Sequence, residues 1–299
     1  MVDDKRLLEE AERRWAALAG ERPELREAVA LQRRLVERGL VLAAAIADLQ
    51  LPEVAAAAGK LQDKRPLLSG ADIILDGTPF KPFVVAFCHD LAHGGAGRPA
   101  ERVHGALERG EIDVGSLLTA SLRRLQTAIR MKANQVGVSP DVLWLVAELG
   151  SAPLAHRLQR AHLRDAPARD AGLRAALDAW DEGRCPACGS WPALAEELAD
   201  VRHLRCSFCG AAWQPAVRRC IYCGDAGDAF LVAALAPGDE PSRRVELCRA
   251  CGGYLKSVRA AAPTPFALLP VADLESSDLD AAAVERGYIR FSMREVDAA

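Results

Sequence analysis

The amino-acid sequence predicts a multi-domain α+β protein, with an N-terminal α-helical domain followed by tandem four-cysteine metal units of the rubredoxin-like or zinc-ribbon type. Apolar residues recur with helical spacing up to about residue 180, and prolines, glycines and cysteines become dense after Gly183. Eight of the nine cysteines form four C-x-x-C pairs. We expect a helical domain at 1–180, cysteine units at 181–215 and 216–262, and a C-terminal segment with a short helix at 263–299.

The helical part is predicted from apolar residues at three- and four-residue steps, which place them on one face of a helix. The first such face is formed by Leu7, Leu8, Ala11, Trp15 and Leu18. A second pattern begins at Pro23, a third runs from Leu117 to Ile129, and Ser139 offers an N-cap for a fourth. A last helix is expected from about Gly172 to Trp180. These segments suit a bundle of five to seven helices.

Three further segments, one between these helical patterns and two after them, are predicted to form loops, a hairpin and a short helix. Residues 66–87 contain glycines and prolines that predict a connecting loop. The run AFLVAALA (229–236), the turn PGDEPS (237–242) and the run RRVEL (243–247) predict a β-hairpin. Near the end, residues 262–270 read as a loop and residues 279–287 as a short helix.

The four C-x-x-C pairs predict metal coordination. A thiolate is a soft, strong ligand, and two C-x-x-C turns that face each other supply a closed tetrahedral site of four sulfurs. Each second cysteine is followed at once by a glycine, as such a turn requires if the backbone there has a positive φ. The predicted ligands are Cys185, Cys188, Cys206, Cys209, Cys220, Cys223, Cys248 and Cys251.

The way in which the pairs combine is not fixed by the sequence. The 17-residue gap between Cys188 and Cys206 suits a four-cysteine zinc site, which favours sequential pairing. The 10-residue link between Cys209 and Cys220 is short enough to leave interleaved pairing open. The metal also stays open, because zinc and rubredoxin-type iron accept the same four thiolates. We therefore expect two metal ions, iron or zinc.

Aromatic and basic residues near the cysteines are expected to support the metal sites. Trp191, Trp213 and Tyr254 are expected to pack beside the metal and exclude water. Five flanking arginines are expected to offset the net negative charge of the two centres, with nucleic-acid binding as the alternative: Arg184, Arg205, Arg218, Arg219 and Arg249. The ninth cysteine, Cys88, is expected to be a small buried apolar residue.

The net charge and the remaining motifs reduce the number of function classes to consider. A net charge of −3 with intermixed signs does not indicate nucleic acid or an anionic membrane as a general partner. No segment has the roughly 20 apolar residues that span a bilayer, and the charged, helical start is unlike a signal peptide, so we expect a cytoplasmic protein. His89, Asp90 and His93 lack the glutamate of a zincin motif, and their role stays open. Because no catalytic arrangement is legible, we expect no enzymatic activity.

Several segments resemble the family of formate dehydrogenase accessory proteins of the FdhE type, namely CPACGSWP, LRCSFCGAAW, CGGYLK, PVADLESSDLD…ERGY and, more loosely, RPLLSGADII. The resemblance implies a helical domain with tandem rubredoxin-like centres, metal bound by all eight paired cysteines, and an association with iron. It implies a cytoplasmic maturation factor, or chaperone, that binds the catalytic subunit of respiratory formate dehydrogenase before export. Alternatives are a thiol or electron-transfer module and a zinc-ribbon protein that binds nucleic acid. A homodimer is among the oligomeric states left open.

Overall fold

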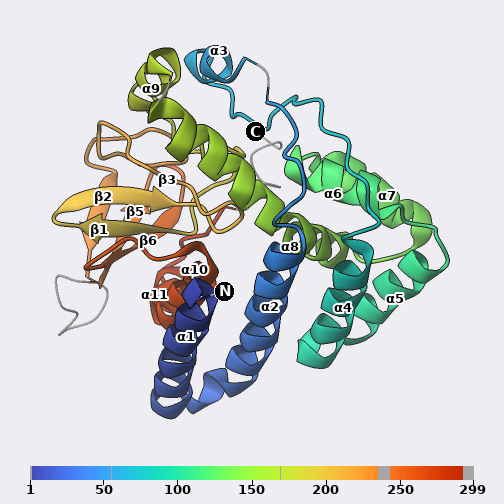
Figure 1. The fold of residues 1–299 in the computed structure, drawn as a ribbon. Coiled ribbons are helices and arrows are strands. Elements are labelled where there is room, and N and C mark those ends of the chain that lie inside the picture. Colours follow the sequence, from blue (N-terminus) through green and yellow to red (C-terminus); the bar gives the residue numbers. More distant parts are fainter. Residues whose placement is uncertain (1, 55, 169, 235–242, 292–299) are drawn as a thin grey trace. The chain divides into compact units, whose positions relative to one another are not determined.

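The computed structural model describes residues 2–54, 56–168, 170–234 and 243–291 (Figure 1). The chain divides into two compact units. We call residues 1–55 and 68–158 the helical unit, and residues 56–67 and 159–299 the cysteine unit. The division into four domains expected from the sequence stays a prediction.

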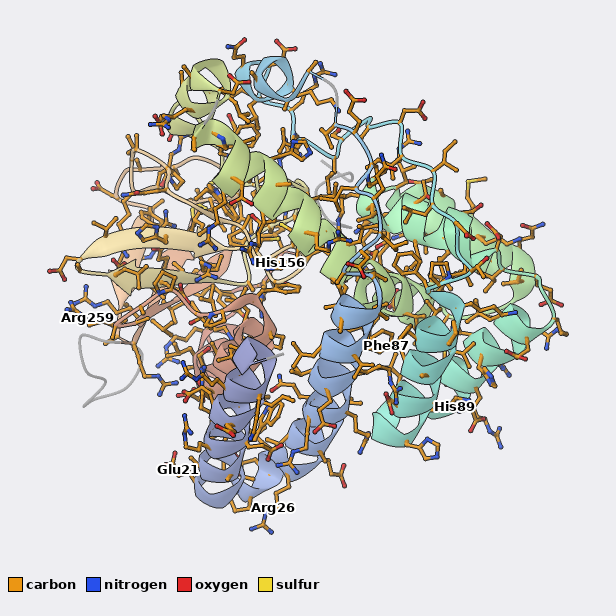
Figure 2. The ribbon with its side chains drawn as sticks, viewed as in Figure 1. Glu21, Arg26, Phe87, His89, His156 and Arg259 are labelled. Atoms are coloured by element: carbon orange, nitrogen blue, oxygen red, sulfur yellow. The ribbon has the colours of Figure 1, made fainter. Side chains whose placement is uncertain are left out.

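The helical unit contains most of the helices expected from the sequence. They are α1 (Val2–Glu21), α2 (Arg26–Ala45), α4 (Lys81–Leu91), α5 (Gly97–Glu108), α6 (Val114–Leu122), α7 (Gln126–Val136) and α8 (Pro140–Gln159). A 3₁₀ turn (Pro23–Leu25) precedes α2, and a π turn (Ala92–Ala96) joins α4 to α5. Glu21 and Arg26 flank the turn between α1 and α2 (Figure 2). The predicted face of α1 is buried at Ala11, Trp15 and Leu18.

The core of the helical unit depends on close helix contacts. Trp15 donates its indole N–H to the side-chain oxygen of Gln32 at 2.7 Å, which joins α1 to α2. Phe87, on α4, is fully buried (Figure 2). Gly150 lets α8 approach its neighbours, because a Cβ there would lie 2.9 Å from Leu118 and 3.0 Å from Val84.

Two sequence predictions for this unit were wrong in part. Residues 66–87 are not all loop, because α4 begins at Lys81 with Pro82 in its first turn, where a proline needs no N–H partner. The single pattern from Leu117 to Ile129 is two helices, α6 and α7. Arg124 lies between them with a left-handed φ of +57°, which interrupts the helix although it is not a glycine.

The cysteine unit is built around one six-stranded sheet. Its strands are β1 (Leu194–Leu198), β2 (Val201–Arg205), β3 (Ala212–Trp213), β4 (Phe230–Ala233), β5 (Arg243–Cys248) and β6 (Tyr254–Arg259), in the order β3-β2-β1-β6-β5-β4. Its helices are α3 (Ala57–Gln62), α9 (Ala171–Asp178), α10 (Leu269–Glu275) and α11 (Ser277–Glu285). Shorter turns are Arg160–Asp165, Ala166–Ala168 and Phe266–Leu268.

The two halves of the sheet join through β1 and β6. These strands run parallel, with Ala195 opposite Ser257, whereas all other neighbours are antiparallel. The predicted hairpin is confirmed where its arms are described, because β4 pairs with β5 from Phe230 opposite Cys248 to Ala233 opposite Val245. The end of the first predicted arm (235–236) and the predicted turn at 237–242 lie outside the described residues. The loop predicted at 262–270 ends early, at the 3₁₀ turn and the start of α10, while the helix predicted at 279–287 lies largely within α11.

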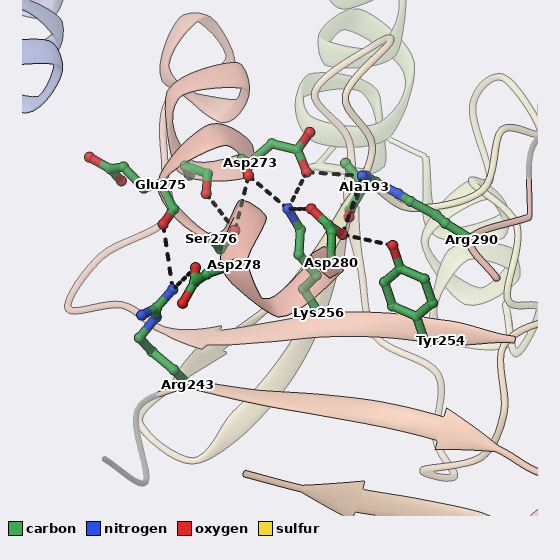
Figure 3. Close-up of polar contacts among 11 residues, drawn as sticks. Ala193, Arg243, Tyr254, Lys256, Asp273, Glu275, Ser276, Asp278, Asp280 and Arg290 are labelled. Carbon is green, nitrogen blue, oxygen red and sulfur yellow. Dashed lines mark hydrogen bonds and ion pairs between the residues drawn. The ribbon is translucent and has the colours of Figure 1, made fainter. Parts of the chain in front are cut away.

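An ion network around the buried Lys256 holds α10 and α11 on the sheet (Figure 3). Lys256 on β6 is fully buried and donates to Asp273 Oδ1 at 2.8 Å, to the Asp273 carbonyl at 2.7 Å and to Asp280 Oδ2 at 2.7 Å. The Tyr254 hydroxyl donates to the other oxygen of Asp280 at 3.0 Å, and Arg290 reaches Asp273 at 3.2 Å. The segments CGGYLK and PVADLESSDLD, which carry the family resemblance, therefore meet in this network.

Candidate metal centres

All four C-x-x-C-G segments fold into the same turn. In each turn the glycine N–H donates to the carbonyl of the first cysteine at 2.9–3.0 Å, and the N–H of that cysteine donates to the residue after the glycine at 2.8–3.0 Å. The glycines have φ between +74° and +82°, as predicted: Gly189, Gly210, Gly224 and Gly252. This is the left-handed region that side chains disfavour, so the trailing glycine is a requirement of the turn.

The turns combine sequentially into two groups of four sulfurs. In the first centre, Cys185 Sγ lies 3.5 Å from Cys209 Sγ, and Cys188 Sγ lies 3.5 Å from Cys206 Sγ. In the second centre, the Cys220–Cys251 and Cys223–Cys248 sulfur pairs are 3.7 and 3.6 Å apart. Sequential pairing, the favoured prediction, is thus the arrangement that the structure has.

These distances fit a metal ion better than disulfide bonds. A disulfide needs sulfurs about 2.05 Å apart. A tetrahedral ion with metal–sulfur bonds of about 2.3 Å places its ligands about 3.8 Å apart, close to the 3.5–3.7 Å found here. Each group could hold one ion with a complete set of four ligands, an arrangement typical of structural sites. The same sulfurs suit zinc and iron.

The first centre is deeply buried, with all four cysteines inaccessible to solvent. Burial, reinforced by hydrogen bonds among the neighbouring thiols, raises the pKa of Cys185 and that of Cys209 well above the ordinary value. Without a cation, thiolates would therefore be strongly disfavoured here. A divalent ion reverses that preference by replacing the thiol protons, so metal binding releases protons.

The second centre is more open, because Cys223 is exposed and Cys251 is partly exposed. Burial raises the pKa of Cys251 to about 11, against the effect of the Gly253 N–H, which donates to its sulfur at 3.4 Å. Burial also acts on Cys248, but the N–H groups of Cys251 and Ala250 and the Cys223 thiol lower its pKa below the ordinary value. The two centres thus share ligands and geometry but differ in solvent access.

This difference predicts an order of reactivity. We expect iodoacetamide to alkylate Cys223 before any cysteine of the first centre, because only an accessible sulfur meets the reagent. Mass spectrometry of the digested protein after timed labelling measures that order. Labelling of Cys185 at the same rate as Cys223 would contradict the burial difference.

An aromatic contact links the two centres. Trp191 follows the first cysteine turn and meets Tyr222, which lies inside the third, edge to face with ring centroids 5.0 Å apart. Tyr222 also contacts Phe291 at 4.8 Å and donates its hydroxyl to the Tyr254 carbonyl at 3.0 Å. Trp213 and Tyr254 are buried, in agreement with their expected packing role. The centres therefore share a hydrophobic wall.

Gly253 is expected to be sensitive to substitution, because the Tyr222 and Phe291 rings leave no room for a side chain. A Cβ at this position would lie 2.5 Å from Tyr222 and 2.8 Å from Phe291. We expect Gly253→Ala to lower the free energy of unfolding of the cysteine unit by about 2 kcal/mol, as overpacking does. The matched control is Gly227→Ala, whose Cβ meets only Asp225 at an ordinary 3.6 Å. Equal denaturation curves for both variants would refute this close contact.

Three of the five arginines next to the cysteines have carboxylates as partners, which differs from the role expected of them. Arg205 pairs with the buried Glu196, and Arg218 with Glu197 at 2.6 Å and Glu246 at 3.1 Å. Arg219 binds Asp181 at 2.8 Å. Since a carboxylate already balances each of these three charges, they neither offset the sulfur charge directly nor form a free basic face.

The other residues that the sequence analysis considered as possible site residues lie in the helical unit. Asp90 is buried and pairs with Arg38 on α2, so it ties α4 to α2. The ring of His93 hydrogen-bonds the His89 carbonyl at 2.7 Å, and His89 lies near the end of α4 (Figure 2). Within the described chain, only the two cysteine groups bring three or more metal-binding side chains together. Cys88 is fully buried, and burial raises its pKa to about 12, as suits an inert core residue.

Together, the fold and the cysteine groups define a class: helical proteins that carry two four-cysteine ribbons in one shared sheet. The chain is similar in fold to the crystal structure of the FdhE protein from Pseudomonas aeruginosa, with a TM-score of 0.59 and 22% sequence identity over 94% of this chain and 92% of that chain. The family resemblance seen in the sequence is thereby confirmed at the level of the fold. No protein-family model matches the chain, and a search of curated proteins gives no significant match.

Proposed function

We propose that this protein is a non-enzymatic accessory factor for the maturation of respiratory formate dehydrogenase. It binds the catalytic subunit of that enzyme in the cytoplasm before export. The observation that carries the proposal is the match to the FdhE protein over 94% of the chain, helical and cysteine units included. A second support is that the chain brings together two groups of four sulfurs, each able to hold one ion.

In this function the metal centres act as structure. Each group supplies four sulfurs, and a four-coordinate ion held by four thiolates keeps no position for a substrate. An ion in each site would fix the cysteine turns of one half of the shared sheet, β1 to β3 for the first centre and β4 to β6 for the second. The same closed coordination supports a binding protein over a metal-dependent hydrolase, and it suits either iron or zinc.

Exposure of the second centre supports a second candidate function, that of a redox-sensitive thiol or electron-transfer module. Cys223 is exposed, so an oxidant or a partner thiol could reach this site while the first stays covered. Nucleic-acid binding has less support, since Arg205, Arg218 and Arg219 are paired with carboxylates.

Affinity capture tests the proposed function. The tagged chain is purified from the soluble fraction of formate-respiring cells, and co-purified proteins are identified by mass spectrometry. We expect the formate dehydrogenase catalytic subunit, and we expect it to be absent when the same cells carry a deletion of its gene. Recovery of the tagged protein with its metal but without that subunit would refute the proposal.

A further inference from the structure

An open groove of about 610 Å³ lies within the helical unit. Its walls are two irregular segments, 49–53 after α2 and 72–79 before α4. Its floor is apolar and includes Phe80 and Leu154, which are almost fully buried. The volume falls in the range of ligand-binding clefts, and the metal centres make no use of it.

The two walls are held in place by specific contacts. Arg157 on α8 donates to the carbonyls of Ile46 and Leu49, the latter at 2.9 Å, which fixes the segment after α2. The Leu75 N–H donates to the Thr119 hydroxyl at 3.2 Å. A Cβ on Gly115 would lie 2.3 Å from the Leu75 carbonyl, so the second wall packs tightly on α6. A groove with fixed walls loses little entropy when a ligand binds.

The rim combines exposed apolar and acidic groups. Ile74 is 87% exposed, the highest fraction among the large apolar residues described. Three carboxylates line the groove, those of Glu53, Asp72 and Asp76, and none of the described lining residues is basic. Hydrogen bonds from Thr78 lower the pKa of Asp76, which keeps that carboxylate charged near neutral pH.

We propose that this groove binds an extended peptide segment of a protein partner, in which arginine or lysine residues flank leucine-like side chains. The apolar floor takes the leucine-like side chains, and the three carboxylates pair with the cations. The walls lie outside helices and strands, so their backbone is suited to main-chain hydrogen bonds with an extended peptide. This inference rests on the proposed client-binding function for the source of the peptide.

Fluorescence anisotropy with purified full-length protein tests the proposal. The probe is a fluorescein-labelled peptide of about ten residues in which leucine alternates with arginine. We expect saturable binding that weakens with added salt, because the charges at the rim are exposed. Peptides with glutamate in place of arginine, or serine in place of leucine, are expected to bind at least tenfold more weakly, which is about 1.4 kcal/mol.

Variants at exposed positions locate the binding without disturbing the fold. We expect Ile74→Ser to weaken binding about tenfold, or about 1.4 kcal/mol, and Asp72→Asn to weaken it and reduce its salt dependence. The matched controls are Met131→Ser on α7, which is also exposed, and Glu101→Gln on α5, which should both bind as the original chain does. Unchanged affinity in Ile74→Ser, or equal affinity for the serine peptide, would overturn the proposal.

Two further measurements distinguish peptide binding in the groove from membrane binding and from client docking elsewhere on the protein. Binding to phosphatidylglycerol vesicles that Ile74→Ser abolishes, without peptide binding, would identify a membrane site and overturn the proposal. If formate dehydrogenase is captured equally by the original chain and by Ile74→Ser, the groove is not the docking site, although the proposed function stands. Peptide binding without capture would leave the groove proposal intact and refute the proposed client.

Discussion

Cys185→Ser is expected to release one of two bound metal ions and to unfold much of the cysteine unit. Structural zinc contributes on the order of 10 kcal/mol to small folded units, and a hydroxyl is a poor substitute for a thiolate in a buried site. Hydrogen exchange should show loss of protection in β1 and β2, whose strands extend from the first centre. Amides of α2 and α8 should keep their protection, because these helices belong to the helical unit.

Two controls make that result specific. Cys88→Ala changes a buried cysteine outside both centres, and it should retain both metal ions with a modest loss of stability. Cys223→Ser should release the other ion with a milder loss of protection, because its site is already open to solvent. Loss of protection throughout both units in Cys185→Ser would show that the first centre does not act locally.

Asp280→Ala is expected to lower the free energy of unfolding of the cysteine unit by about 3 kcal/mol, as breaking a buried ion pair does. The substitution removes one of the two carboxylates that face Lys256, whose side chain is fully buried, and it also removes the acceptor of the Tyr254 hydroxyl. Chemical denaturation monitored by near-ultraviolet circular dichroism measures the change. The double variant Asp280→Ala with Lys256→Met should recover part of the loss, since it removes the charge left without a partner.

Asp278→Ala is the matched control for this prediction. Asp278 lies two residues away on α11 and pairs with Arg243 on β5 at 2.5 Å, but both side chains are more than a third exposed. Exposed pairs contribute less than about 1 kcal/mol, so this variant should be nearly neutral. If Asp278→Ala and Asp280→Ala lowered the free energy of unfolding equally, the result would contradict the claim that the buried Lys256 network stabilises the fold more than an exposed ion pair does.

The cysteine turns could be predicted from the sequence because their determinants are local. Two cysteines two residues apart and a glycine with positive φ define each turn, and the four trailing glycines have the predicted positive φ. The amphipathic faces of α1 and α2 are local patterns of the same kind. The arms of the β4–β5 hairpin were also predictable, since they are neighbours in sequence.

Features that depend on distant residues could not be predicted. The parallel pairing of Ala195 with Ser257 joins strands some sixty residues apart, and neither segment encodes its partner locally. Lys256 was not expected in the core, because a lysine is buried only when acceptors such as Asp273 and Asp280 come from another part of the chain. The break between α6 and α7 at Arg124 could not be predicted either, since an arginine gives no local indication of a left-handed backbone.

The measurement that tests the central claim most directly is elemental analysis of the protein produced in its own host and purified without chelators. The two groups of four sulfurs predict two equivalents of iron or zinc per chain, and Cys185→Ser should contain one. Material that is fully folded yet contains no transition metal, with the eight sulfurs free or joined in disulfides, would contradict the claim that two ions organise this part of the molecule.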